Sequence, residues 1–477
     1  MTHPDPSPTP DPMPSPDERH AMTTDTSPRA GTSPSPTEPG RTSIVKVVFA
    51  SLIGTAVEWY DFFLYGSAAA LVFGTLFFPD SEPATATLLA FGTYALGFVA
   101  RPLGGIVFGH FGDRVGRKKM LVFSLFLMGL ATFAIGLLPT YASIGVAAPL
   151  LLLACRLVQG FAVGGEWGGA VLMAAEHGDD SQRGFWSSWP QAGVALGNLF
   201  ATGVLWVLAA VQSDAAFESW GWRVPFLLSA VLVGVGLWVR LSIEESPVFK
   251  EARTELAAKE TTHLPLVEVF RKYPKEVFVA MGMRMAENIS YYLFTVISIS
   301  FLTIYAGTAD DKSLILKALL IGSVVHFVTI PVVGALSDRV GRRPLYLVGA
   351  VGVAAWSWVF FDLIASRSEG KIILAIVVGL VLHALMYAPQ AAFFSELFGT
   401  SVRYTGASVG YQLASIFAGA LAPIIAIELL GDATAGVTNV PKVAVYMTVA
   451  SVITIVAVLF AHETKATSLR HDRVLGD

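Results

Sequence analysis

Ionisable side chains recur at helical spacing inside two apolar segments of this chain. Glu58, Asp61 and Tyr65 lie at positions i, i+3 and i+7 and so share one face of a helix. A second set follows the same pattern: Arg284, Glu287, Asn288 and Tyr291. Burial disfavours the charged form of a carboxyl, whereas a nearby arginine favours it. A carboxyl whose arginine is taken over by an anionic ligand would change its proton affinity, so the pattern predicts proton-linked binding of an anion.

Three arginines in apolar segments are candidates for holding that anion. Arg101, Arg156 and Arg284 each carry a planar guanidinium, which can bind a carboxylate through two parallel hydrogen bonds. Each could equally be an internal counter-ion for one of four acidic side chains: Glu58, Asp61, Glu166 and Glu287. The sequence leaves both interpretations open.

The acidic residues also differ as candidates for proton coupling. Glu58 and Asp61 are the first choice, and Glu166 or Glu287 is the second. Histidines titrate near neutrality, and two lie in apolar segments, but an isolated histidine in a helix is more often a hydrogen-bonded structural residue: His326 and His383. Neutral side chains that could contact a substrate, or equally bond helix to helix, are Tyr387, Gln390, Tyr411 and Gln412.

The elements that carry these residues are predicted to cross a membrane. The chain has 477 residues, is 54% hydrophobic and 14% charged, and has a mean hydropathy of +0.61, so it is too apolar for an ordinary soluble domain. A span needs about 20 apolar residues. Twelve such segments predict an all-α membrane protein: 44–77, 84–109, 119–138, 147–175, 187–211, 222–243, 276–306, 314–337, 344–366, 371–395, 405–429 and 440–461. The net charge of −4 does not suggest a nucleic-acid partner.

Two decapeptides 225 positions apart indicate that the chain is duplicated. The segments 109–118 (GHFGDRVGRK) and 334–343 (GALSDRVGRR) agree at six of ten positions. Both are basic turns that must lie in water on one membrane face, which requires an even number of spans per repeat. We therefore expect two pseudo-symmetric six-helix bundles, 43–243 and 276–462, joined by a charge-rich cytoplasmic linker at 244–275.

A second pair of matches supports the duplication. Glu176 and Arg183 recur as Glu396 and Arg403 at an offset of 220. The offset of 225 carries Arg101 to His326, and the offset of 220 carries Glu166 to Met386. The polar pocket between the halves is therefore expected to be asymmetric.

The charge distribution predicts that both termini are cytoplasmic. Residues 1–42 hold 11 of the 26 prolines and read as a disordered tail without the features of a signal peptide. Most of the 32 Lys and Arg residues lie in segments that share one side with this tail. Residues 463–477 would form a short second cytoplasmic tail.

The duplicated decapeptide resembles the signature loop of the major facilitator superfamily. The resemblance implies that its Asp meets the positive end of a helix in the other half and that its arginines pair with carboxylates, closing the cytoplasmic side. In this chain the residues of such a gate are Gly109, Asp113, Arg114, Gly116, Arg117, Asp338, Arg339, Arg342, Glu176, Arg183, Glu396 and Arg403.

Four further segments are similar to the metabolite:proton symporter family of that superfamily. They are 58–66 (EWYDFFLYG), 101–105 (RPLGG), 156–169 (RLVQGFAVGGEWGG) and 220–225 (WGWRVP). Members of the family carry shikimate, 2-oxoglutarate, citrate, or proline and betaine. The resemblance, which runs from about residue 44 to residue 463, implies alternating access by two rocking halves around a pocket near the membrane midplane.

Motifs for other functions are absent from the sequence. It has no Gly-x4-Gly-Lys-Ser/Thr loop, no His-Glu-x2-His motif, no clustered cysteines and no assembled nucleophile triad. We expect no enzyme activity, metal or cofactor, and a functional monomer in the cytoplasmic membrane driven by the proton gradient. The predicted function is uptake of a small carboxylate-bearing metabolite with a proton.

Two alternatives stay open at this point. One is a proline or betaine carrier, although only about sixteen residues follow Ala461 where such carriers can bear a long coiled coil. The other is a receptor that binds a metabolite without moving it. An attached signalling domain would favour this alternative, and the sequence shows none.

Overall fold

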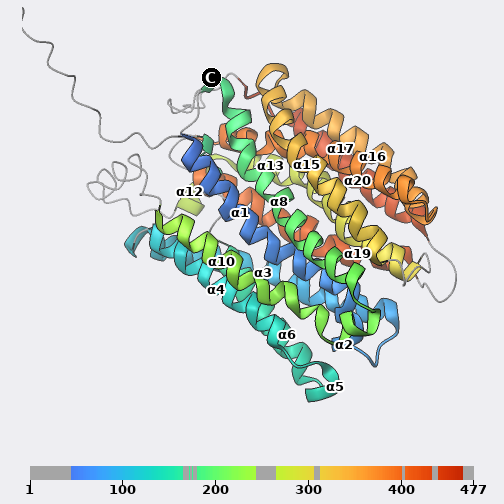
Figure 1. The fold of residues 1–477 in the computed structure, drawn as a ribbon. Helices are drawn as coiled ribbons and strands as arrows, with labels where there is room; N and C mark the ends of the chain where they lie inside the picture. The colour runs from blue at the N-terminus through green and yellow to red at the C-terminus, as the bar shows by residue number, and fades with distance from the viewer. Residues whose placement is uncertain are drawn as a thin grey trace, which may run out of the picture. The chain divides into compact units, whose positions relative to one another are not determined.

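The structure is a computed structural model, and it describes residues 44–115, 117–164, 171, 174–175, 180–242, 265–305, 312–399, 403–431 and 439–465. The predicted tail at 1–42 and most of the predicted linker at 244–275 lie outside these ranges. From Ser43 to Asp477 the chain is one compact unit. The described residues form helices joined by short turns (Figure 1).

Each of the twelve predicted spans corresponds to a helix or to a run of consecutive helices. In the N-terminal half (residues 44–242) these are α1 (Ile44–Ala68) with η1 (Ala69–Phe73) and α2 (Gly74–Phe77), α3 (Pro83–Val115), α4 (Arg117–Leu137), α6 (Ala147–Val163), α8 (Arg183–Val211), and α9 (Asp214–Ala216) with η3 (Phe217–Gly221) and α10 (Arg223–Ser242). Two short helices, α5 (Tyr141–Ile144) and η2 (Asp180–Gln182), lie between spans.

The C-terminal half (residues 274–460) repeats this pattern. Its spans are α13 (Pro274–Tyr292) with η4 (Leu293–Ile297), α14 (Ser298–Ser300) and η5 (Phe301–Tyr305), then α15 (Lys312–Val340), α16 (Arg342–Ala365), α17 (Glu369–Leu397), α18 (Arg403–Ser415) with η7 (Ile416–Ala420) and α19 (Leu421–Leu430), and α20 (Val440–Phe460). The short helix α12 (Pro265–Lys272) precedes it.

The spans differ in length and straightness. Within the described ranges, nine helices are long and apolar enough to cross a membrane unaided. A tenth span is bent by 47° between Asp214–Gly221 and Arg223–Val239, and two shorter apolar helices, Val122–Leu137 and Ala147–Val163, complete the twelve. The predicted fourth span, 147–175, is described as a continuous helix only as far as Val163, because most of the glycine-rich run after it lies outside the described residues.

Glycines bring α3 and α6 together and thereby position two of the candidate arginines. A Cβ atom at Gly160 would overlap the carbonyl oxygen of Gly97, and one at Gly164 would overlap that of Arg101. Only small residues allow two membrane helices to approach so closely. The two backbones are therefore in contact beside Arg101 and Arg156.

The two halves meet along α8. This helix packs against α15 of the C-terminal half and against α1 of its own half (Figure 1). Asn198 of α8 donates a hydrogen bond of 3.1 Å from Nδ2 to Ser323 Oγ of α15. Large apolar side chains on the outside of the unit, such as Leu103 and Val231, stay exposed, as expected for surfaces that face lipid.

Candidate functional site

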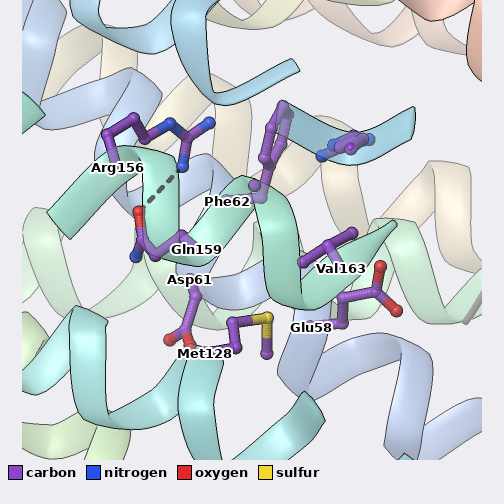
Figure 2. Close-up of a pocket in the computed structure, with 9 residues that line it drawn as sticks. Glu58, Asp61, Phe62, Met128, Arg156, Gln159 and Val163 are labelled. Atoms are coloured by element: carbon purple, nitrogen blue, oxygen red, sulfur yellow. Dashed lines mark hydrogen bonds between the residues drawn. The ribbon is translucent and has the colours of Figure 1, made fainter. Parts of the chain in front are cut away.

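A cavity inside the N-terminal half brings four of the predicted site residues together (Figure 2). It is lined by side chains from α1, α3, α4 and α6, among them Glu58, Asp61, Arg101 and Arg156. Helical spacing places Glu58 and Asp61 on one face of α1, and the close contact of α3 with α6 supplies the arginines. The cavity thus combines carboxyl groups with guanidinium groups at one place in the apolar interior.

Asp61 is the more isolated of the two carboxyl groups. Its side chain is 2% exposed, and neither carboxylate oxygen accepts a hydrogen bond from the described part of the chain. Its electrostatic neighbours are Thr132, Arg156 and Glu58. In Figure 2 its carboxylate points toward Met128, whereas that of Glu58 points in a different direction. An ionised carboxylate buried without donors is costly, so this environment suits a carboxyl that exchanges a proton.

A chain of polar side chains connects Arg156 to the neighbourhood of Asp61. Arg156 Nη1 donates to Gln159 Oε1 at 3.0 Å (Figure 2), and Gln159 Nε2 donates to Thr132 Oγ1 at 2.7 Å. Thr132 in turn faces Asp61. Gln159 and Thr132 were not predicted as site residues, because neutral side chains in apolar helices carry no signal that separates them from packing.

Arg101 and Arg156 are held by aromatic rings rather than by acidic side chains. Their Cζ atoms lie 4.6 and 4.8 Å from the centroid of the Phe62 ring. Because both distances are measured to one centroid, the two Cζ atoms are at most 9.4 Å apart. Neither arginine forms an ion pair with a described carboxylate. Their positive charges are therefore available to an anion in the cavity.

Arg284 has a different environment in the C-terminal half. Its Nη1 forms an ion pair of 2.8 Å with Glu287 Oε2 and donates to Gln390 Oε1 at 3.1 Å. Its Cζ lies 3.3 Å from the centroid of the Tyr411 ring. Of the two interpretations left open by the sequence, the geometry favours an internal counter-ion for Arg284 and availability for Arg101 and Arg156.

Glu287 is also joined to two histidines. Its Oε1 lies 3.3 Å from His383 Nε2, and His383 Nδ1 lies 3.0 Å from His326 Nε2. All three residues are at least 97% buried. From the sequence the two histidines were predicted to be isolated structural residues, whereas the structure places them in contact. No sequence signal links them, because they lie on different helices, α15 and α17.

The remaining predicted contacts are divided between a second cavity and the packing around it. Asn288, Tyr291 and Tyr387 line this cavity together with Trp59 of the other half. The hydroxyls of Tyr291 and Tyr387 have no hydrogen-bond partner among the described residues. Tyr65 does not line either cavity. Its hydroxyl bonds Thr93 Oγ1 at 2.6 Å, and its ring packs under the Arg156 guanidinium.

Four aromatic rings pack together beside the two cavities: those of Phe62, which lines the first cavity, of Tyr292, which lines the second, and of Tyr94 and Phe98. The ring of Tyr292, from α13, lies with its centroid 6.2 Å from those of Phe62, Tyr94 and Phe98. Tyr94, Phe98 and Tyr292 were not predicted as site residues, because aromatic residues in apolar helices usually belong to the packed core.

The second decapeptide forms a network with the start of α8. Asp338 accepts hydrogen bonds from the backbone N–H groups of Gly184 and Phe185 at 2.8 and 2.9 Å. These groups belong to the first turn of α8, where the helix dipole favours a negative charge. Arg342 Nη1 contacts Asp338 Oδ1 at 2.8 Å. The geometry implied by the family resemblance is therefore present at this copy of the loop.

Glu396 links the same network across the two halves. Its Oε1 lies 2.8 Å from Arg183 Nη1 and 3.2 Å from Arg342 Nη2. The structure places two other predicted gate residues differently. Arg339 is exposed and pairs with no described carboxylate, and Arg403 donates to the carbonyl of Phe398 at 3.4 Å.

The segment after α20 completes this network, which the sequence did not predict. Glu463 accepts hydrogen bonds of 3.0 Å from the backbone N–H groups of Arg342 and Arg343, at the start of α16. Thr464 Oγ1 donates to Glu396 Oε2 at 2.6 Å. Gly341 precedes α16 with a φ of +108°, and a Cβ atom there would crowd Glu463.

Several predicted residues cannot be placed. Gly116, Glu166 and Glu176 lie outside the described residues, as do the side chains of Asp113, Arg114 and Arg117, and nothing is described around Gly109. Among the residues that are described, no three His, Cys, Asp or Glu side chains are grouped as ligands for a metal ion.

Comparison with known proteins identifies the family. The family described as sugar (and other) transporter matches residues 46–474. The chain is 42% identical over 427 residues to the inner membrane metabolite transport protein YhjE of Escherichia coli K12, covering 89% of this chain and 95% of that protein. It is 39% identical over 421 residues to the shikimate transporter of the same organism, covering 88% and 95%. With the proline/betaine transporter of E. coli K12, identity is 34% over 432 residues, covering 89% and 85%.

Solved structures show the same fold. The proton:xylose symporter XylE of the major facilitator superfamily, from E. coli, superimposes with a TM-score of 0.67 at 16% identity, covering 89% of this chain and 97% of that chain. The sequence family and the fold agree with the predictions of a duplicated twelve-helix membrane protein. This chain is therefore a member of the sugar (and other) transporter family, a multi-pass membrane transporter with the major facilitator fold.

Proposed function

We propose that this transporter carries a small carboxylate-bearing metabolite into the cell together with one or more protons. Two six-helix halves rock around the cavities described above, with both termini and the Asp338–Glu396 network on the cytoplasmic side. The protein acts as a monomer in the cytoplasmic membrane and needs no cofactor beyond the proton gradient.

The observation that carries this proposal is the pair of guanidinium groups in the N-terminal cavity that form no ion pair with a described carboxylate. Arg101 and Arg156 are 4% and 2% exposed and have no described acidic partner, although a buried charge is costly unless it is paired. A bound carboxylate supplies the missing negative charge. Because the two groups lie within 9.4 Å of each other, one compact anion can interact with both.

Asp61 supplies the link to the proton. It is an electrostatic neighbour of Arg156, and the hydrogen bonds from Arg156 through Gln159 end at Thr132, another neighbour of Asp61. When Asp61 is protonated, Arg156 loses a nearby negative charge and binds an anionic substrate more strongly. When the substrate leaves, Arg156 again favours ionisation of Asp61, and the proton is released.

A zwitterion carrier of the proline and betaine type is the second candidate. A quaternary ammonium group binds to the open faces of aromatic rings. In this cavity Arg101 and Arg156 already lie against the rings of Phe62, Phe98 and Tyr94. Identity to the shikimate transporter, at 39%, also exceeds that to the proline/betaine transporter, at 34%. Both observations favour an anionic substrate.

Uptake of labelled shikimate into proteoliposomes tests the proposal. With an acidic exterior, the wild-type protein is expected to accumulate shikimate, and a protonophore is expected to abolish accumulation. Arg101→Gln and Arg156→Gln each remove a charge-assisted contact worth about 1.5–3 kcal/mol. KM should therefore rise roughly ten- to hundredfold. Arg271→Gln, which removes an exposed positive charge far from the cavity in sequence, is the matched control.

Asp61→Asn separates coupling from binding. It should retain exchange of labelled for unlabelled shikimate but lose accumulation driven by the pH gradient. Betaine offered in competition distinguishes the second candidate. Accumulation that resists the protonophore, or betaine uptake that exceeds shikimate uptake, would contradict the proposal.

A further inference from the structure

We propose that His326, His383 and Glu287 form a second proton-binding site, in the C-terminal half, and that protonation of Glu287 frees Arg284 to bind the substrate anion. The inference rests on the proposed function and adds to it a second titratable carboxyl with a defined route for its proton. It predicts that two protons move with each substrate.

Basic or titratable residues follow one carboxyl residue of each half at similar distances along the sequence. Arg101 and Arg156 follow Asp61 by 40 and 95 residues, and His326 and His383 follow Glu287 by 39 and 96 residues.

Contacts support this correspondence independently of the numbering. Arg156 lies over the ring of Tyr65, and His383 packs against the ring of Tyr291 with centroids 4.9 Å apart. Tyr65 and Tyr291 each follow their half's carboxyl residue, Asp61 or Glu287, by four positions. The C-terminal half thus carries two titratable imidazoles where the N-terminal half carries two permanently charged guanidiniums.

The hydrogen bonds define the direction of the histidine chain. An ionised carboxylate only accepts hydrogen bonds, so His383 Nε2 must donate to Glu287 Oε1. The other nitrogen of neutral His383, Nδ1, is then an acceptor, and His326 Nε2 must donate to it. Every hydrogen atom between the three groups therefore points toward Glu287.

This arrangement can pass one proton from water to Glu287 through the two histidines. A proton from water binds His326 Nδ1, the proton on His326 Nε2 moves to His383 Nδ1, and the proton on His383 Nε2 moves to Glu287 Oε1. Both histidines end neutral in the other tautomer. The hydrogen bonds persist with reversed direction, because Glu287 now donates to His383 and His383 to His326. The net change is that Glu287 loses its negative charge.

The loss of that charge acts on Arg284. In the structure Glu287 Oε2 holds both Arg284 Nη1, at 2.8 Å, and Gln390 Nε2, at 3.1 Å. Once Glu287 is neutral, Arg284 keeps only neutral partners among the described residues, namely Gln390, Ser415 and the ring of Tyr411. A guanidinium without an ion pair then faces the cavity between the halves, just as Arg101 and Arg156 form no ion pair with a described carboxylate in the other cavity.

Other groups around the chain do not replace its members as proton carriers. The charged or titratable side chains that face it come from four helices: Arg284, Tyr291 and Tyr292 from α13, Tyr346 from α16, Tyr387 from α17 and Tyr411 from α18. The neighbouring helices of the other half contribute neutral side chains, Asn198 and Gln191 from α8 and Trp59 from α1. Tyrosines and arginine keep their protons near neutral pH. The titratable groups in this range are therefore the two histidines and the carboxyl.

Infrared difference spectra between acidic and neutral pH test the site without any substrate. Full-length protein in lipid nanodiscs should show the C=O band of a protonated carboxyl that Glu287→Gln removes. His383→Gln and His326→Gln keep hydrogen-bonding side chains but cannot accept the proton, so each should shift the pH at which this band appears. Asp61→Asn should remove a different band, and His462→Gln, an exposed histidine, should leave both bands unchanged.

The proton count per substrate gives a second measurement. Reversal potentials for shikimate should give two protons in the wild-type protein and one in Glu287→Gln. A carboxyl band that survives Glu287→Gln, or one that neither histidine variant shifts, overturns the second site. A wild-type count of one does the same. Absence of shikimate transport by the wild-type protein would count against the proposed substrate, while the infrared result would still decide the second site.

Discussion

Arg183 and Glu396 form an ion pair of 2.8 Å that joins the two halves of the transporter beside the second decapeptide. Both side chains are almost completely buried. Since Glu396 also contacts Arg342 and Thr464, one carboxylate ties the start of α8 to α16 and to the segment that follows α20. Separation of the halves on this side requires that these contacts break.

Glu396→Gln should therefore shift the protein toward the state that is open on this side. Removing one partner of a buried ion pair costs about 3–5 kcal/mol, so the closed state should lose most of its population. Distances between spin labels on α8 and α15 report the shift. Arg339→Gln removes an exposed arginine from the same loop and should leave the distance distribution unchanged; an equal response of both variants would contradict the assignment.

Lys312 links the two halves at the other end of α15, where its loss should favour opening on the opposite side of the protein. Its Nζ lies 3.1 Å from Glu218 Oε1 and 3.5 Å from Asp214 Oδ1, so it also links the two halves. Lys312→Gln should favour opening at this end, by about 1 kcal/mol or less because the acidic partners are exposed. Lys317→Gln breaks a pair with Glu369 inside one half and serves as the control. The same labels should respond to the first variant only.

Close packing of α3 on α6 predicts strong effects of small substitutions. Gly160→Ala would place a methyl group where the Gly97 carbonyl lies, and overpacking of this kind costs about 1–3 kcal/mol. The helices would separate and displace Arg101 and Arg156. We expect a lower melting temperature and a higher KM for shikimate. Gly92→Ala, on α3 with open space around it, should change neither quantity.

The stabilising contribution of Glu463 to the gate network should depend on pH. Burial by itself raises the pKa of this carboxyl. Hydrogen bonds from the backbone N–H groups of Arg342, Arg343, Lys465 and Thr464 lower the pKa by a larger amount, so the net shift is downward. A carboxyl whose pKa is lower in the folded state stabilises the fold above its unfolded pKa, about 4.3 for Glu. This stabilisation is lost as the pH falls through the folded pKa.

Thermal unfolding measured from pH 7 down to pH 3 checks this sign. The difference in stability between the wild-type protein and Glu463→Gln should be largest at neutral pH and should shrink below about pH 4. Glu428→Gln, at an exposed position near the end of α19, is the matched control. A difference that grows on acidification would show that Glu463 does not stabilise the network in its ionised form.

Sequence alone determined the membrane location, the twelve helices and the duplication, because these follow from local properties. About 20 apolar residues must cross a bilayer as a helix whatever lies beside them. The repeated decapeptide and the spacing of Glu58 with Asp61, or of Arg284 with Glu287, are likewise properties of a single segment. The family resemblance rests on the same continuous runs of residues.

Only the tertiary structure decided which buried charges are paired. The three candidate arginines all lie in apolar segments of the sequence. In the structure, however, Arg284 forms an ion pair with Glu287, whereas Arg101 and Arg156 pack against aromatic rings. His326 and His383 are 57 residues apart and meet because α15 and α17 pack side by side at one rotation of each helix. Helix rotation and packing depend on contacts across the whole bundle, so no single segment of the chain encodes them.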